Sequence, residues 1–202
     1  PFFLLASIMG MLMPGLWGLT FSGKITMPAG INPMQWHAHE MLYGFGAAVL
    51  IGFLLTASKN WVNVRGIHGA ALMGLAGLWT FERGLIFYSS GDSYLIKHLG
   101  LSLFLAASGI YIAWTLIKYN KGDTFKDNYF FLFLLAMIVL SKNLLLSEIY
   151  YQHGIAMSLG LFRLAFTIMF ERTIPQFMKA TEGVSLYRNF FLDYAIKILI
   201  AI

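Results

Sequence analysis

Long apolar runs separated by short polar connections dominate this chain. Six of them approach the ~20 residues that a helix needs to cross a bilayer. They cover residues 2–21, 36–57, 68–88, 99–116, 129–150 and 155–177. A further apolar run begins near residue 190 and is too short to cross before residue 202. Because none of the runs alternates with the period of two of a barrel strand, we expect an all-α, polytopic transmembrane helix bundle. It has six full spans and part of a seventh, within one transmembrane domain over residues 1–202.

Composition supports this class and removes several kinds of chemistry. Hydrophobic residues make up 58% of the chain and charged residues 11%, which is far from a soluble globular protein. Cysteine is absent, which excludes disulfides, thiolate metal sites and covalent haem attachment through cysteine. The net charge of +5 does not indicate nucleic acid as a partner, because Lys and Arg gather in the cytoplasmic loops of membrane proteins. The predicted surroundings are the lipid bilayer.

The basic residues predict the orientation of the bundle. Seven fall in the second, fourth and sixth connections, namely Lys59, Arg65, Lys118, Lys121, Lys126, Lys179 and Arg188. Two fall in the other connections, namely Lys24 and Lys97. The positive-inside rule then predicts a cytoplasmic N-terminus. It also predicts that four histidines share the outer face and that His68 lies on the cytoplasmic side. The four are His37, His39, His98 and His153.

Charged residues inside the predicted spans are costly in hydrocarbon and are therefore informative. Most belong to the outer halves of three spans, namely Glu40, Glu82, Arg83, Lys142 and Glu148. Arg163 is expected near the midplane. We expect these groups to neutralise one another in a polar pocket inside the bundle, and we expect Arg163 to have a partner there rather than to face lipid.

The sequence Trp-His-Ala-His-Glu over residues 36–40 begins the second run and is the main candidate site. His37 and His39 project about 200° apart on a regular helix, so they are not expected to bind one metal together. One imidazole is a candidate iron ligand, and the other a ligand of a second metal or a partner of a haem propionate. The alternative is a pair of interfacial histidines bonded to loop carbonyls. His153, in a short connection on the same face, is a third candidate metal ligand or an ordinary turn residue.

Three further patterns each carry a structural and a functional interpretation. Arg163 is either a counter-ion to a buried carboxylate or a donor to an anionic cofactor group such as a propionate. The methionines at positions 9, 11 and 13 are either apolar filler or soft ligands of copper(I). Small residues following Glu40 in steps of four are typical of close helix packing, and the sharper alternative is a flat cofactor against the backbone. These residues are Gly44, Ala48 and Gly52.

Several segments together resemble the NnrS family. These are Pro-Phe-Phe-Leu-Leu at residues 1–5, Trp-His-Ala-His-Glu-Met-Leu-Tyr-Gly-Phe at 36–45 and Gly-Phe-Leu-Leu-Thr-Ala at 52–57. Asn-Trp at 60–61 and Glu-Arg-Thr-Ile-Pro-Gln-Phe at 171–177 complete the pattern, which spans nearly the whole chain.

The resemblance implies a bacterial inner-membrane protein that contains haem, with b-type haem expected, and copper. The family is associated with tolerance of nitric oxide, without an established reaction, so no enzyme activity is assigned. Family members are about twice this long with roughly twelve spans, and the chain is therefore expected to be an N-terminal half. Under this resemblance His37 or His39 is the axial ligand, and Arg83 or Arg163 pairs with propionates.

Two other classes of function stay open. In the first, the intramembrane charges form the route of a transporter or ion pathway. In the second, the chain is a structural subunit of a respiratory complex, and the charges only fix helix packing. A second copy of the chain is a further candidate partner. A Soret band in the purified protein separates haem binding from both alternatives.

Overall fold

The computed structural model describes residues 1–27, 32–88, 98–119, 126–184, 191 and 195. All regular structure in these residues is helical. In chain order the elements are α1 (Phe2–Phe21), α2 (Pro33–His39), the π-helix η1 (Glu40–Gly46), α3 (Ala47–Trp61), α4 (Gly69–Tyr88), α6 (Leu103–Lys118), the 3-10 helix η3 (Lys126–Tyr129), α7 (Phe130–Leu146) and α8 (Tyr151–Thr181). The predicted all-helical class is confirmed.

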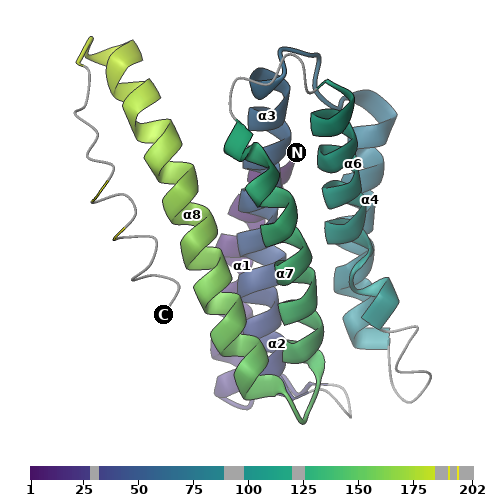
Figure 1. Cartoon of the computed structure of the whole chain (residues 1–202). Coiled ribbons are helices and arrows are strands. Elements are labelled where there is room, and N and C mark those ends of the chain that lie inside the picture. The colour runs from purple at the N-terminus through teal and green to yellow at the C-terminus, as the bar shows by residue number, and fades with distance from the viewer. Residues whose placement is uncertain (28–31, 89–97, 120–125, 185–190, 192–194, 196–202) are drawn as a thin grey trace.

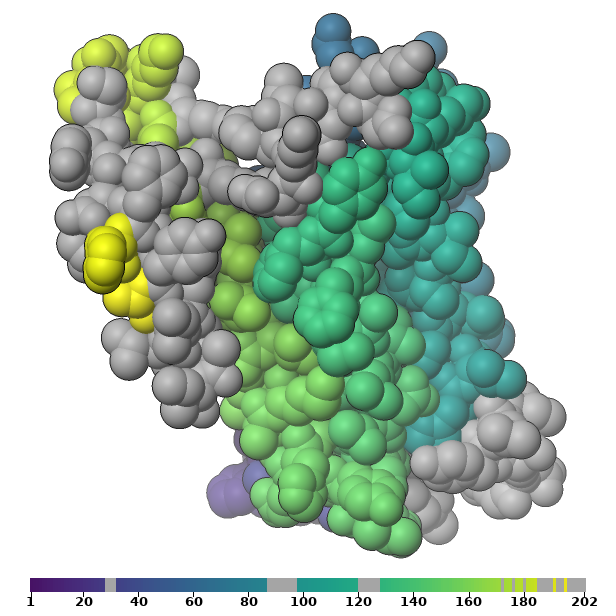
Figure 2. Space-filling view, viewed as in Figure 1, coloured from purple at the N-terminus to yellow at the C-terminus, as the bar shows by residue number. Residues whose placement is uncertain are grey.

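The long helices run alternately up and down in one bundle (Figure 1). We call the end where α2 lies, α7 ends and α8 begins the α2 end, and the end where α3 stops and α4 begins the α3 end. The α7 and α8 helices share the most extensive contact in the bundle, and Figure 2 shows their side chains packed against each other on the viewed face.

The helix Pro33–Trp61, made of α2, η1 and α3, occupies the centre of the bundle. In its most apolar window 61% of the residues are buried, against 22% in α1 and 33% in α8. Parts of it contact α1, α6, α7 and α8. Asn32 caps its start, since Met34 N donates to Asn32 Oδ1 at 3.0 Å and Pro33 occupies the first helical position.

Within the described residues, three helices are long and apolar enough to span a membrane, namely Phe2–Phe21, Pro33–Trp61 and Tyr151–Lys179. The apolar helices Leu103–Lys118 and Phe130–Leu146 are shorter. These helices fit a membrane protein. They do not confirm six full spans, and most of the predicted seventh run lies outside the described residues.

The helix ends differ from the sequence prediction around the fifth connection. The predicted run to residue 150 stops at Leu146, because Ser147 adopts an extended conformation with ψ of 132°. The α8 helix begins at Tyr151 rather than at residue 155, so His153 lies in a helical turn and not in a connection. This helix also continues through Pro175 and past the predicted end of the run at residue 177, as far as Thr181.

The small-residue stripe of the central helix packs against α1. A Cβ on Gly52 would lie 3.0 Å from Phe2 Cβ, and one on Gly44 would lie 2.8 Å from Met9 Cε. This geometry supports the helix-packing interpretation. Met9 and Met13 are buried core residues, whereas Met11 is 73% exposed, so the three methionines are not gathered at one site.

Candidate functional site

Four charged side chains from three helices meet in the interior of the bundle. Lys142 Nζ of α7 lies 2.7 Å from Glu82 Oε2 of α4. Arg83 NH2 lies 3.4 Å from the same oxygen, and Arg83 Nε lies 3.0 Å from Glu40 Oε2 of η1. We call Glu40, Glu82, Arg83 and Lys142 the charge cluster. Two carboxylates and two cations balance, as the cost of buried charge requires.

The charge cluster is closed off from solvent and tied to the backbone. The side chains of Glu82 and Lys142 are fully buried, and that of Arg83 is 12% exposed. Phe104 N, in the first turn of α6, donates to Glu82 Oε1 at 2.9 Å, and Lys142 Nζ donates to the Leu101 carbonyl. A carboxylate at a helix N-terminus satisfies an orphan amide and the local dipole. The cluster therefore fixes α4, α6, α7 and η1 relative to one another.

His39 extends the cluster and leaves one ring nitrogen free. Its side chain is fully buried, and Nδ1 donates to Glu40 Oε1 at 2.8 Å. Nε2 is buried and has no hydrogen-bond partner among the described residues. A carboxylate that holds one nitrogen fixes the tautomer in which the other carries a lone pair, and metal-binding histidines are oriented in this way.

The π-helix begins at the point where His39 and Glu40 are both buried. His39 is the last residue of α2 and Glu40 the first of η1. Wider π turns change the direction of successive side chains relative to an α-helix, and they are frequent at functional sites. Trp79 Nε1 donates to the carbonyl of Gly44 at 3.1 Å, which adds a partner to the backbone of this segment.

His37 packs against a different element from His39. Its ring stacks on Trp17 of α1 with centroids 4.2 Å apart, and its Nδ1 is buried without a hydrogen bond among the described residues. The two imidazoles therefore have separate surroundings, in agreement with the predicted divergence along the helix.

The remaining histidines lie at opposite ends of the bundle, His98 and His153 at the α2 end and His68 at the α3 end. His98 Nδ1 contacts Asn143 Oδ1 at 2.7 Å, and His153 is exposed in the first turn of α8 at the α2 end. His68, between α3 and α4, donates from Nδ1 to the Gly66 carbonyl at 2.8 Å at the α3 end.

Arg163 and Glu148 do not join the charge cluster. Arg163 is exposed on α8 and forms no ion pair with a described residue, which differs from the expectation of an enclosed Arg163. The reason is rotational, because depth along α8 is set by sequence position and the buried face by packing against α7. Glu148 is exposed because α7 ends before it. Arg83, by contrast, is part of the charge cluster, because it contacts the carboxylates of Glu40 and Glu82.

A neighbouring hydroxyl group network was not predicted from the sequence. Tyr43 Oη lies 2.8 Å from Ser141 Oγ and 2.5 Å from Ser158 Oγ, which connects η1 with α7 and α8. All three side chains are buried, and the rings of Tyr43 and His39 are 5.5 Å apart. Ser141 stands next to Lys142, and Ser158 lies one helical turn after Gly154. The sequence signal for this network was the presence of these small polar side chains within apolar runs.

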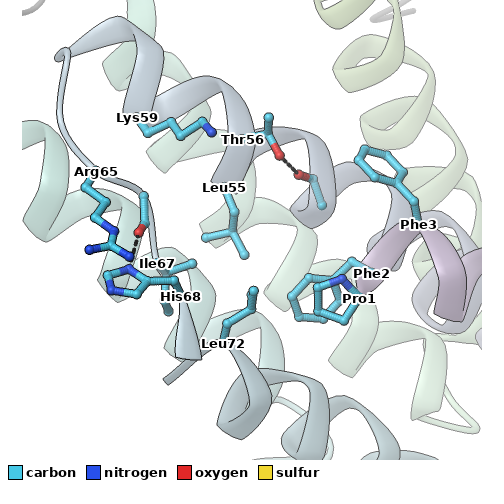
Figure 3. Close-up of a pocket in the computed structure, with 12 residues that line it drawn as sticks. Pro1, Phe2, Phe3, Leu55, Thr56, Lys59, Arg65, Ile67, His68 and Leu72 are labelled. Atoms are coloured by element: carbon cyan, nitrogen blue, oxygen red, sulfur yellow. Dashed lines mark hydrogen bonds between the residues drawn. The ribbon is translucent and has the colours of Figure 1, made fainter. Parts of the chain in front are cut away.

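The described residues contain no group of three or more His, Asp or Glu side chains arranged to hold a metal ion. A cavity of about 300 Å³ lies at the α3 end, away from the charge cluster (Figure 3). Among the described residues of the α2 end, both His39 Nε2 and His37 Nδ1 are buried ring nitrogens without a hydrogen bond, and His39 is the one whose other nitrogen is held by a carboxylate.

Comparison with known proteins identifies a family. The family described as NnrS protein matches over residues 1–202. No curated protein and no solved structure matches the chain.

Proposed function

This chain belongs to the NnrS family, and from this membership we propose that it is a haem-binding protein of the bacterial inner membrane with a role in the nitric oxide response. The observation that supports the proposal is the buried Nε2 of His39, which has no hydrogen-bond partner in the described part of the chain, while Nδ1 of the same ring is bound to Glu40. In this proposal α1, the helix Pro33–Trp61, α4, α6, α7 and α8 are six membrane crossings. The N-terminus is cytoplasmic, and the α2 end faces outward.

The donor set fits haem better than a metal ion held by protein ligands alone. A porphyrin supplies four ligands to its iron, so a single imidazole such as that of His39 would be enough protein ligand to hold haem. A copper or zinc site needs several protein donors together. Among the described residues His39 offers one free nitrogen without a second donor arranged beside it. Bound haem supplies an iron atom at which nitric oxide can coordinate.

The residues behind His39 hold its proton and its ring. Glu40 accepts the Nδ1 proton, which keeps the Nε2 lone pair available for a ligand, and a carboxylate there makes the imidazole a stronger donor. Arg83 Nε faces the other Glu40 oxygen at 3.0 Å, and this contact orients the carboxylate. Lys142 and Glu82 then fix Arg83 in turn.

The other candidate residues keep narrower roles within the proposal. His37 is a ligand of a second metal such as copper or a partner of a haem propionate, and His153 is a metal ligand at the same end. Arg163, exposed on α8, is free to pair with a propionate, whereas Arg83 is already engaged by two carboxylates. His39 is a single donor, and a second copy of the chain or a further part of the same protein would supply the additional ligands of the site.

The test is the Soret absorbance of purified protein variants. We expect His39→Ala to abolish the Soret band and His37→Ala to leave haem bound with an altered spectrum or altered nitric oxide affinity. The matched pair differs by two positions on one helix. His39→Gly with added imidazole should regain the band, because the free ligand can occupy the space of the side chain.

Size-exclusion chromatography separates loss of haem from loss of fold in each variant. Full haem occupancy in His39→Ala would contradict the proposal for His39 and move the ligand to His37 or His153. A wild-type protein without haem after expression with haem supply would contradict the function as a whole.

A second candidate function is an ion pathway, and the continuous charge cluster favours it. Glu82 and Lys142 form a fully buried pair, and the chain of ion contacts continues to Glu40 across three helices. Such intramembrane charges are typical of proton relays. Proteoliposomes with an internal pH dye test it. Proton flux that is lost in Glu82→Gln, in a protein that lacks a Soret band, would favour this function over haem binding.

A further inference from the structure

The cavity at the α3 end has a basic side and an apolar side. Lys59 of α3 contributes to it, with Arg65 and His68 from the segment between α3 and α4 (Figure 3). No carboxylate is among the twelve described residues that line the cavity. Lys59 and Arg65 form no ion pair with any residue in the described ranges. The positive charge at this cavity is therefore unbalanced by the described part of the chain.

Local structure holds the Lys59 side chain beside the cavity. The turn after α3 closes through a hydrogen bond from Val64 N to the Lys59 carbonyl at 2.9 Å, with Asn63 at a φ of 51°. Gly66 then lies against the aliphatic stem of Lys59, and a Cβ there would be 3.0 Å from Lys59 Cδ. A stem packed in this way leaves the ammonium group free for a ligand.

His68 is oriented in the same turn. Its Nδ1 donates to the Gly66 carbonyl at 2.8 Å, and the ring lies next to Arg65 at the edge of the cavity (Figure 3). Gly66 therefore connects the two basic positions, because its Cα packs on Lys59 and its carbonyl binds His68.

The opposite wall is apolar and continuous with the core. Phe2 is 3% exposed and Leu55 is 5% exposed, and Leu72 of α4 is a further apolar residue that lines the cavity. A small inorganic anion would make no favourable contact with these apolar side chains. A phospholipid matches both sides, with its phosphate at the basic residues and the first carbons of an acyl chain along the apolar residues.

We propose that the α3-end cavity binds an anionic phospholipid, with its phosphate held by Lys59, Arg65 and His68 and an acyl chain along Phe2, Leu55 and Leu72. The inference rests on the membrane location in the proposed function and not on haem. That location puts the α3 end at the cytoplasmic leaflet, where anionic lipids and basic residues attract each other.

Native mass spectrometry of the purified full chain tests the proposal, with phosphatidylglycerol or phosphatidylcholine added after delipidation. We expect wild-type protein to retain phosphatidylglycerol preferentially. The double variant Lys59→Gln/Arg65→Gln removes two basic residues and should lower that retention by roughly thirtyfold. The control Lys118→Gln/Lys179→Gln removes the same charge from the ends of α6 and α8 and should keep most of it.

Three results would overturn the proposal. Equal retention in Lys59→Gln/Arg65→Gln would show that the cavity is not the site. An equal loss in the control would show attraction by net charge alone. Complete displacement by inorganic phosphate would identify a free anion as the ligand. The His39→Gln variant should bind lipid as wild type does, so the failure of one proposal is distinguishable from the failure of the other.

Discussion

Each end of the bundle carries one arginine and one lysine of interest, and the surroundings of these two cations differ between the ends. At the α2 end, Arg83 and Lys142 face two carboxylates and are largely enclosed. At the α3 end, Lys59 and Arg65 border a cavity without a carboxylate among its described lining residues. Paired and enclosed charge fixes side chains in place, whereas unpaired charge beside a cavity is available to a ligand. Function at the α2 end therefore rests on His39, and at the α3 end on the cations themselves.

Breaking the buried pair gives the largest expected effect. Lys142→Met leaves Glu82 without its closest cation in a closed interior, and the free energy of unfolding should fall by ~3–5 kcal/mol. The double variant Glu82→Gln/Lys142→Met removes both charges and should recover much of that loss. Lys59→Met at the α3 end is the matched control and should change stability little, because no partner is left behind. Chemical denaturation in detergent micelles measures all three.

A loss below ~1 kcal/mol in Lys142→Met would mean that water reaches the charge cluster, since only exposed pairs contribute so little. The comparison between an enclosed end and an open end would then no longer hold.

Two glycine substitutions compare how far each end can adjust. A Cβ on Gly44 meets Glu40 Oε2 at 2.7 Å and Met9 Cε at 2.8 Å, within the packed core. Gly44→Ala should therefore cost ~1–3 kcal/mol of unfolding free energy by overpacking. It should also alter the Soret spectrum, because Glu40 orients His39.

Gly66→Ala is the counterpart at the α3 end. Its Cβ meets only the flexible stem of Lys59 at 3.0 Å, and stability should stay within about 0.5 kcal/mol of wild type. Equal costs for Gly44→Ala and Gly66→Ala would show that the two ends are equally rigid.

The contrast between the two ends was only half visible in the sequence. The depth of charges along each apolar run predicted that Glu40, Glu82 and Lys142 meet, because a buried charge needs a partner at its own level. Depth does not give rotation, so Arg163 was expected inside and is exposed. The π turn at Glu40–Gly46 depends on tertiary packing that no local pattern reports.

The basic residues of the α3 end were used in the sequence analysis only to predict the orientation of the bundle in the membrane. Lys59 and Arg65 counted toward the positive-inside rule, and nothing in their spacing indicated a cavity. The cavity arises because the N-terminal turn of α1 lies beside α3 and α4, which are distant in sequence. The sequence predicted how deep a residue lies along its helix, and it did not predict which face of the helix the residue occupies.

Removing a single hydroxyl group at the α2 end should have a smaller effect than these changes. Tyr43→Phe deletes the oxygen between Ser141 and Ser158, while both serines keep backbone acceptors at Ile138 and Gly154. The expected cost is about 1 kcal/mol, the net worth of a buried hydrogen bond. Thermal unfolding of Tyr43→Phe beside wild type measures it. Haem content should not change, since the His39 to Glu40 bond does not involve this hydroxyl, and a lost Soret band would place Tyr43 in the ligand site.

A change of ionic strength should also distinguish the two ends, and it is the change with the smallest expected effect on the stability of the fold. Salt screens exposed charges over a Debye length of about 8 Å at 0.15 M and about 3 Å at 1 M, whereas buried pairs are screened much less. Raising salt should therefore weaken retention of phosphatidylglycerol at Lys59 and Arg65, whose surroundings are open. The stability difference between wild type and Lys142→Met should stay constant over the same range, because Lys142 and Glu82 are fully buried. Denaturation and lipid retention at matched salt concentrations check both. A salt-sensitive Lys142→Met difference would indicate an ion-accessible charge cluster, which is the property that an ion pathway needs and an orienting network for His39 does not.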